Sequence, residues 1–188
     1  MNLANKITMV RIFMIPLFMV AYLVDFPYHN LVACAIFALA AFTDGVDGYV
    51  ARNYKMVTDF GKFIDPLADK LLIATALICF VEKNEIAGYM AVLIIAREFI
   101  VTGLRTVAMS KGVVIAASMT GKIKTCIQII AVICVFLFGQ DAVYGDFAIK
   151  MFGSSYTVGY IAMFIATIYT VYSGIEYLAK NKELLADQ

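Results

Sequence analysis

Six long apolar runs, separated by short polar breaks, dominate this sequence of 188 residues. A helix needs about 20 residues, with a range of about 17–25, to cross the hydrocarbon core of a bilayer. Each run has a length within this range, so we interpret the runs as spanning helices. They cover residues 7–25, 31–52, 64–82, 86–107, 121–139 and 156–178. We therefore expect an all-α membrane protein with six transmembrane helices.

The composition agrees with a membrane protein and limits the partners. The chain is 63% hydrophobic and 15% charged, whereas soluble domains have about 45–50% apolar and about 25% charged residues. The net charge of +1 argues against nucleic acid as a partner, because such proteins need a concentrated basic surface. The length favours a single domain over residues 1–188.

The distribution of lysine and arginine predicts the orientation in the membrane. With six spans, both termini lie on one side, together with the segments at 52–62 and 105–124. Of the fifteen basic residues, only Lys83 and Lys150 fall in the breaks of the opposite side. Basic residues concentrate in cytoplasmic loops. We therefore expect a multi-pass cell-membrane protein with both termini in the cytoplasm.

The strongest signal is an acidic motif that spans the second polar break. Asp44 and Asp47 are three residues apart, and Asp65 and Asp69 are four apart, so each pair shares one face of a helix. A short connection makes the two helices antiparallel neighbours, and all four carboxylates then meet at the cytoplasmic end. The full spacing is Asp44-x-x-Asp47-Gly48-x-x-Ala51-Arg52, eight residues, Gly61-x-x-x-Asp65-x-x-x-Asp69.

Four facing carboxylates in a membrane protein indicate bound cations. Acidic side chains are costly in a membrane and repel one another unless they are neutralised. Oxygen ligands suit Mg²⁺ or Mn²⁺, and two such ions can hold a phosphoryl group and its leaving oxygen. Gly48 leaves room for close approach of a ligand, and Arg52 can donate to a phosphate. The alternative is a pair of solvated helix ends whose acids are paired with Arg52, Lys55, Lys62 and Lys70.

The acidic motif resembles the signature of the CDP-alcohol phosphotransferase family and matches it completely. Four further stretches, at residues 5–11, 61–70, 96–99 and 121–125, are similar to bacterial members that use glycerol 3-phosphate. The resemblance implies a six-helix membrane fold, usually a homodimer. It also implies Mg²⁺- or Mn²⁺-dependent transfer of the phosphatidyl group of CDP-diacylglycerol to sn-glycerol 3-phosphate, which gives phosphatidylglycerophosphate and CMP.

The resemblance also implies roles for individual residues. The metal ligands would be Asp44, Asp47 and Asp65, and Asp69 would bind a second metal ion and act as the general base. Contacts to the cytidine diphosphate part of the donor would come from Asn5, Gly48, Arg52 and Thr58.

Cationic residues outside the motif suggest where an anionic acceptor binds. Arg105, Lys122 and Lys124 lie at cytoplasmic ends of the fourth and fifth runs. Alone they are typical of cytoplasmic loops, but beside an acidic site they can form a pocket for the acceptor phosphate. Arg97 and Glu98 lie within the fourth run, either as a buried pair that fixes packing or with Arg97 on the substrate phosphate.

Polar residues also recur at helical spacing in the last run, at Tyr169, Tyr172, Ser173 and Glu176. Such a stripe is usually packing or an interfacial belt, and substrate contact by Glu176 or a tyrosine is the alternative.

Two alternative functions remain open at this level. Within the family, the acceptor could be serine, an inositol compound or phosphatidylglycerol. Outside it, the carboxylates could line a cation-transport path. A transporter, however, places its acids near the midplane and often shows repeated halves with broken helices, whereas these acids cluster at one end and no repeat is evident.

Overall fold

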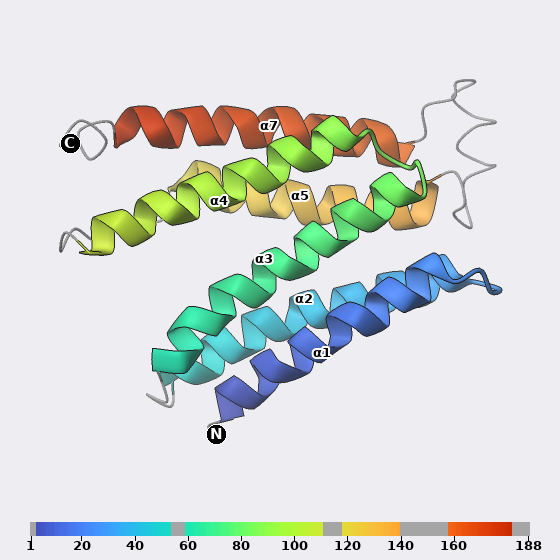
Figure 1. Cartoon of the computed structure of the whole chain (residues 1–188), viewed down its shortest axis with the longest axis horizontal. Coiled ribbons are helices and arrows are strands. Elements are labelled where there is room, and N and C mark those ends of the chain that lie inside the picture. Colours follow the sequence, from blue (N-terminus) through green and yellow to red (C-terminus); the bar gives the residue numbers. More distant parts are fainter. Residues whose placement is uncertain (1–2, 54–58, 111–117, 140–157, 182–188) are drawn as a thin grey trace.

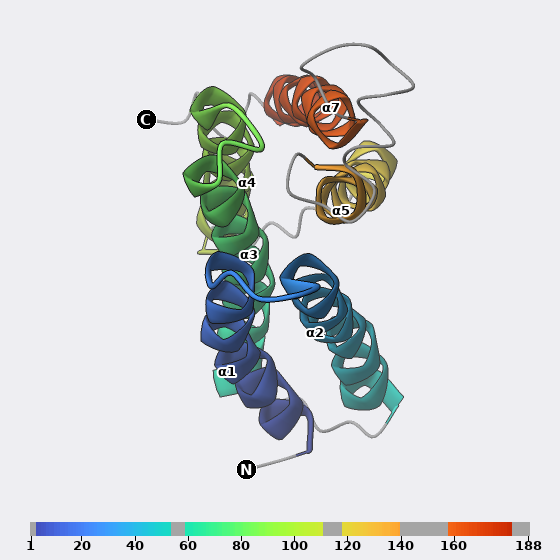
Figure 2. The same cartoon turned by 90° about the vertical axis from the view of Figure 1, so that its right-hand side faces the viewer.

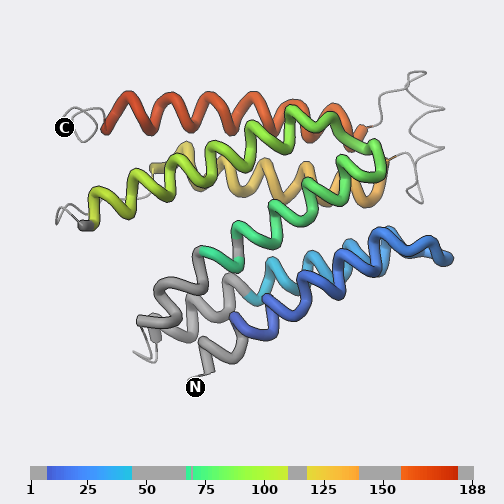
Figure 3. Tube along the Cα trace, in the orientation of Figure 1, coloured from blue at the N-terminus to red at the C-terminus, as the bar shows by residue number. Residues whose placement is uncertain are grey.

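A computed structural model describes residues 3–53, 59–110, 118–139 and 158–181, and side chains within these ranges except at 3–7, 44–53, 59–66, 69 and 110. Figure 3 colours the part of the trace in which the side chains are described. These ranges are helical almost throughout, and no strand occurs in them. The helices are α1 (Leu3–Leu23), α2 (His29–Asn53), α3 (Asp59–Glu82), α4 (Gly88–Ser110), α5 (Met119–Phe138) and α7 (Val158–Lys180).

The expected helices are confirmed with small shifts of their ends. The largest shift is in α3, which begins at Asp59 although the apolar run begins at residue 64. Hydropathy finds the apolar part of a helix, whereas the backbone hydrogen bonds continue through the polar residues before it. Helix α3 therefore begins before the apolar run, and it contains Gly61 and Asp65.

The helices form two rows that pack against each other. In Figure 2, α1, α3 and α4 make one row, and α2, α5 and α7 make the other. Consecutive helices run in opposite directions, so α1 begins and α7 ends at the same end of the bundle (Figure 1). The contacts agree with this arrangement, because α2 packs on α1, α3 and α5, while α7 packs on α4 and α5.

Aromatic side chains pack together in the half of the bundle that is remote from the chain termini. Phe136 of α5 lies 5.0 Å from Phe80 of α3 and 5.8 Å from Phe18 of α1, measured between ring centroids. Tyr22 and Phe37 also contact the Phe136 ring, at 5.5 and 5.7 Å. Several of these pairs are edge-on, the geometry that ring quadrupoles favour. The cluster joins α1, α2, α3 and α5 into one core.

Two glycines of α7 allow its neighbours to approach closely. A Cβ atom at Gly159 would lie 2.7 Å from the Cα of Val135, so α5 and α7 are in contact through their backbones. A Cβ atom at Gly174 would lie 2.9 Å from Cγ of Arg97. Small residues at helix interfaces are typical of membrane bundles.

Large apolar side chains cover the outside of the bundle. Phe13, Phe42, Val92 and Ile175 are 70%, 72%, 65% and 63% exposed. Within the described residues, two helices, α5 and α7, are long and apolar enough to cross a membrane. Extensive exposed apolar surface is rare in soluble monomers, and together these features indicate a membrane protein.

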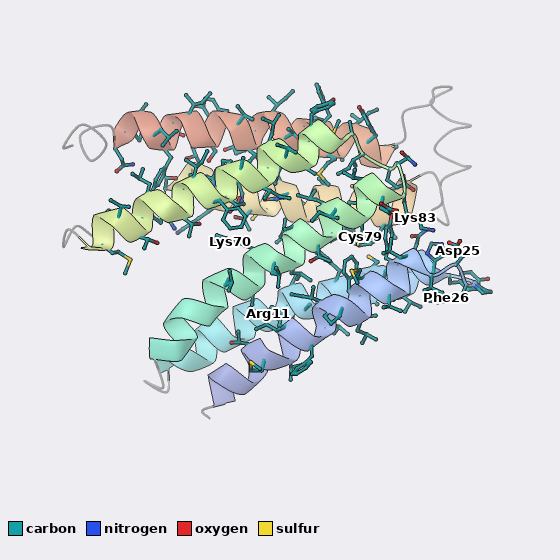
Figure 4. The ribbon with its side chains drawn as sticks, in the orientation of Figure 1. Arg11, Asp25, Phe26, Lys70, Cys79 and Lys83 are labelled. Atoms are coloured by element: carbon teal, nitrogen blue, oxygen red, sulfur yellow. The ribbon has the colours of Figure 1, made fainter. Side chains whose placement is uncertain are left out.

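An ion pair joins two loops at the end remote from the chain termini. Lys83, after α3, donates to Asp25, after α1, at 2.6 Å. Figure 4 labels both residues at this end of the bundle. The hydrogen bond and the charge of Lys83 hold the pKa of the exposed Asp25 carboxyl below its ordinary value.

Candidate functional site

The four aspartates of the motif lie on two helices that pack against each other. Asp44 and Asp47 are in the second half of α2, and Asp65 and Asp69 are in the first half of α3. Because α2 ends and α3 begins at one end of the bundle, the backbone carries both pairs to that end, as predicted. Their side chains lie outside the described ones. As a donor set, four carboxylates on neighbouring helices fit hard divalent cations.

Arg11 anchors α1 to α2 directly before the motif. Its side chain is completely buried, and its Nε donates to the carbonyl oxygen of Ala40 at 3.2 Å and to Oγ1 of Thr43 at 3.4 Å. The Thr43 hydroxyl in turn donates to Ala40, at 2.7 Å. Figure 4 shows Arg11 where α1 passes α2. A buried guanidinium persists only where acceptors surround it, so this contact fixes the backbone from which Asp44 follows.

A cationic cavity of about 230 Å³ opens between α3, α4, α5 and α7. Among the described side chains, its polar wall contains a single carboxylate, which belongs to Glu98, and five cationic groups. The cavity is therefore suited to an anion. Four of the cations are the residues that the sequence indicated for an acceptor phosphate. The five are Lys70, Arg97, Arg105, Lys122 and Lys124.

A network of charged side chains forms one wall of this cationic cavity. Glu98 of α4 forms an ion pair with Lys124 of α5, whose side chain is only 5% exposed. Glu98 also contacts Nη1 of Arg97 at 3.5 Å. Nη2 of Arg97 donates to the hydroxyl of Ser173 on α7 at 2.9 Å, while its Nε is buried without a partner among the described residues. The pair contacts α5 through Lys124 and α7 through Ser173, and it also borders the cavity. Contact of Arg97 with a substrate phosphate stays a prediction.

Arg105 is held by the aromatic ring of Tyr177 from α7. The Nε of Arg105 donates to the Tyr177 hydroxyl at 3.1 Å, and its guanidinium carbon lies 5.5 Å from the ring centroid. Tyr177 is buried, with 4% of its surface exposed. Tyr177 restricts the arginine through the hydrogen bond to its hydroxyl and through a cation–π contact with its ring. The arginine is thus oriented before any ligand arrives.

The start of α5 completes the cavity. Ser118 is the N-cap of this helix, and its hydroxyl accepts from the backbone N–H of Gly121 at 3.1 Å. Both residues line the cationic cavity beside Lys122. Serine at this position satisfies one of the free N–H groups of the first turn, so the cap fixes where α5 presents its two lysines.

The residues predicted for donor binding lie outside what the structure describes in detail. Asn5 is on α1, and Gly48 and Arg52 are on α2, each without a described side chain. Thr58 lies between the described ranges. Their roles stay predictions.

The sequence did not single out three polar residues that lie inside the bundle: Lys70 and Tyr177, which line the cationic cavity, and Gln128, which is buried on α5. Lys70 of α3 was noted only as a partner for solvated acids, yet it faces α4 and α5 across the cationic cavity (Figure 4). Tyr177 lies one turn after Ser173 and continues the stripe in the last run. Gln128 is a lone amide within the apolar run of α5, and such an isolated polar residue was a usable signal. Of the stripe itself, Ser173 contacts Arg97, whereas Glu176 pairs with Lys180 and Tyr172 is 57% exposed.

Comparison with known proteins agrees with this arrangement. Residues 1–172 match the model of the CDP-alcohol phosphatidyltransferase family. A protein of Bacillus subtilis (strain 168) named CDP-diacylglycerol–glycerol-3-phosphate 3-phosphatidyltransferase is 44% identical, with 98% of this chain and 97% of the relative covered. Proteins of the same name from Rickettsia bellii and Sodalis glossinidius are 35% and 34% identical, over 97% and 95% of this chain and 96% and 93% of theirs. The chain therefore belongs to the CDP-alcohol phosphatidyltransferase family.

Proposed function

We propose that this protein transfers the phosphatidyl group of CDP-diacylglycerol to sn-glycerol 3-phosphate and releases phosphatidylglycerophosphate and CMP. The observation that carries the proposal is the cationic cavity at the end of the bundle where the aspartate helices meet. An acceptor that has its own phosphate needs such a cavity, because an unpaired anion is costly in an apolar bundle. Serine and free inositol would bring no phosphate to these cations, whereas a phosphorylated inositol compound or phosphatidylglycerol would. The names of the relatives support the same acceptor.

In this proposal the aspartates hold two divalent cations, Mg²⁺ or Mn²⁺. The ligands are Asp44, Asp47, Asp65 and Asp69. When bound, the ions neutralise the pyrophosphate of the donor and stabilise the departing CMP. Gly48, Arg52 and Thr58, with Asn5 at the start of α1, contact the cytidine diphosphate.

The chemistry is a displacement at the phosphorus that bears diacylglycerol. The acceptor hydroxyl oxygen forms a bond to this phosphorus while Asp69 takes the hydroxyl proton. The bond between the phosphorus and the oxygen of CMP breaks, and CMP leaves with the electron pair. Arg97, Arg105, Lys122 and Lys124 hold the acceptor phosphate, so that binding fixes the attacking oxygen in position.

The same proposal places the whole chain in the cell membrane as one domain, residues 1–188. All six helices span the bilayer, both termini and the active site face the cytoplasm, and two copies form a homodimer. Exposed apolar side chains on every helix support the spanning arrangement, for example Phe13, Leu39, Ile78, Val92, Ile130 and Ile165. Reporter fusions at each end, and chemical cross-linking in membranes, test the orientation and the dimer.

A panel of acceptors tests the reaction. Purified protein with CDP-diacylglycerol and Mg²⁺ should release CMP with glycerol 3-phosphate, and not with serine or inositol. CMP release with phosphatidylglycerol alone would assign the cationic cavity to a lipid acceptor instead, and no CMP with any acceptor would refute the transferase.

Single cation variants test the cavity. Arg105→Ala, Lys122→Ala and Lys124→Ala should each raise KM for glycerol 3-phosphate by roughly 10- to 150-fold, because a charge-assisted contact contributes roughly 1.5–3 kcal/mol. KM for the lipid donor should not change. Lys180→Ala is the matched control, since Lys180 pairs with Glu176 and does not line the cavity. A rise in the donor KM alone would place the acceptor elsewhere.

Aspartate variants test the metal site separately. Asp44→Asn, Asp47→Asn and Asp65→Asn keep the side-chain shape but remove ligand charge, so each variant should lose nearly all activity. Chelation of the metal should abolish the activity of the wild type in the same way. Asp69→Asn should still bind the donor and lose transfer by about 10²–10⁴-fold, the usual cost of a missing general base. Normal turnover of two ligand variants at saturating Mg²⁺ would overturn the assignment.

A further inference from the structure

A second cavity of about 110 Å³ adjoins the cationic one. It lies between α2, α3, α4 and α5, and it is large enough for several water molecules. The Glu98–Lys124 ion pair lines both cavities and so lies between them. Lys70 and Thr125 are also shared. The two spaces are therefore neighbours along one path between the helix rows.

The second cavity leads towards the aspartate helices. Ala41 lines it from α2, three residues before Asp44, and Lys70 lines it from α3, directly after Asp69. An acceptor whose phosphate rests on the cations must extend its reacting hydroxyl towards these helices. Among the described residues, the second cavity is the space that lies between the Glu98–Lys124 ion pair and α2.

Gln128 of α5 offers an unused polar group in this second cavity. It lies one turn after Lys124, is 2% exposed, and lines the cavity. Its amide nitrogen has no hydrogen-bond partner among the described residues. Buried amide groups nearly always have partners, so this donor points to a ligand group that belongs in the cavity.

We propose that Gln128 determines acceptor specificity by donating a hydrogen bond to the C2 hydroxyl of glycerol 3-phosphate. This inference rests on the proposed function. In that acceptor the C2 hydroxyl stands between the phosphate and the reacting C1 hydroxyl, as the second cavity lies between the cationic cavity and α2, which carries Asp44 and Asp47. A site built to bond a hydroxyl discriminates against an analogue that lacks it, because the protein donor is then left unpaired.

The test compares glycerol 3-phosphate with 3-hydroxypropyl phosphate, which keeps the phosphate and the reacting hydroxyl but lacks the C2 hydroxyl. The wild type should prefer glycerol 3-phosphate in kcat/KM by about tenfold or more. Gln128→Met keeps the side-chain length and should bring this preference close to one, mainly through loss on glycerol 3-phosphate. Gln128→Leu, which also lacks any hydrogen-bonding group, should lose the preference too and serves if the methionine variant does not fold.

Thr167→Val is the matched control, because Thr167 is buried, donates to Met163 of its own helix at 2.8 Å, and lines neither cavity. It should keep the preference. An unchanged preference in both Gln128 variants, or an equal loss on both acceptors, would overturn the inference while leaving the transferase intact. A wild type that uses neither acceptor would refute the proposed function and this inference with it.

Discussion

Gly174→Ala tests whether the position of Arg97, rather than its charge alone, matters for the acceptor. A Cβ atom at residue 174 would lie 2.9 Å from Cγ of Arg97 and 3.9 Å from its Cβ and Nε. Cγ is near the base of the side chain, so Arg97 cannot escape by moving only its tip. It must change rotamer, which breaks the 2.9 Å hydrogen bond to Ser173.

The size of the effect follows from what Arg97 does in the cavity. A displaced guanidinium loses a charge-assisted contact of roughly 1.5–3 kcal/mol, which is roughly a 10- to 150-fold loss of kcat/KM for glycerol 3-phosphate. Overpacking of this kind also costs about 1–3 kcal/mol of stability. The loss should appear when the acceptor is varied, whereas KM for CDP-diacylglycerol should stay the same.

The control is Gly103→Ala on α4. A Cβ atom there would have no neighbour within 4 Å, and alanine in a helix is favoured over glycine by about 1 kcal/mol. This variant should match the wild type in both Michaelis constants and unfold at the same or a higher temperature. CMP release gives the kinetics, and loss of the helical circular dichroism signal follows unfolding. Wild-type acceptor kinetics in Gly174→Ala, or an equal loss in Gly103→Ala, would refute the reasoning.

Two further predictions concern stability at the other end of the bundle. Gly159→Ala puts a Cβ atom 2.7 Å from the Cα of Val135, so backbone must move, and thermal unfolding should show a loss of about 1–3 kcal/mol; an unchanged Tm would mean that α5 and α7 are farther apart than described. The lowered pKa of Asp25 stabilises the fold at neutral pH, and this contribution should fade as the pH falls below the ordinary aspartate value and through the lowered one. Lys83→Met should be less stable than the wild type at neutral pH, with a difference that shrinks in acid; a difference independent of pH would exclude the ion pair as its cause.

The sequence predicted the helices well because long apolar runs depend on composition within one segment. It also placed both aspartate pairs at one end of the bundle, because a short connection between two consecutive helices makes them antiparallel. It missed how Glu98 is used. The sequence shows Arg97 directly beside Glu98. Lys124, the ion-pair partner of Glu98, lies 26 residues away on another helix, and only tertiary packing brings these two side chains together.

The roles of Tyr177 and Lys70 also depend on tertiary packing, so the sequence did not predict them. A tyrosine in a membrane helix is compatible with packing, with the interface and with a site, and no local pattern separates these roles. Lys70 follows Asp69 directly, so the motif drew attention to the acid and not to the base beside it. Both residues acquire a role only once α3, α4, α5 and α7 are placed around one cavity.

The arrangement of the chain separates two tasks that an enzyme of this kind must combine. The aspartate motif occupies α2 and α3, whereas the cations of the cavity, apart from Lys70, come from α4 and α5, and the two arginines among them are held by Ser173 and Tyr177 of α7. Under the proposed assignment, the first half of the chain carries the reaction and the second half chooses its recipient. A family built in this way can change its product by exchanging the C-terminal helices while the chemistry stays in place. A chimera that joins residues 1–87 to the remaining helices of a relative with another acceptor should therefore redirect the enzyme to that acceptor.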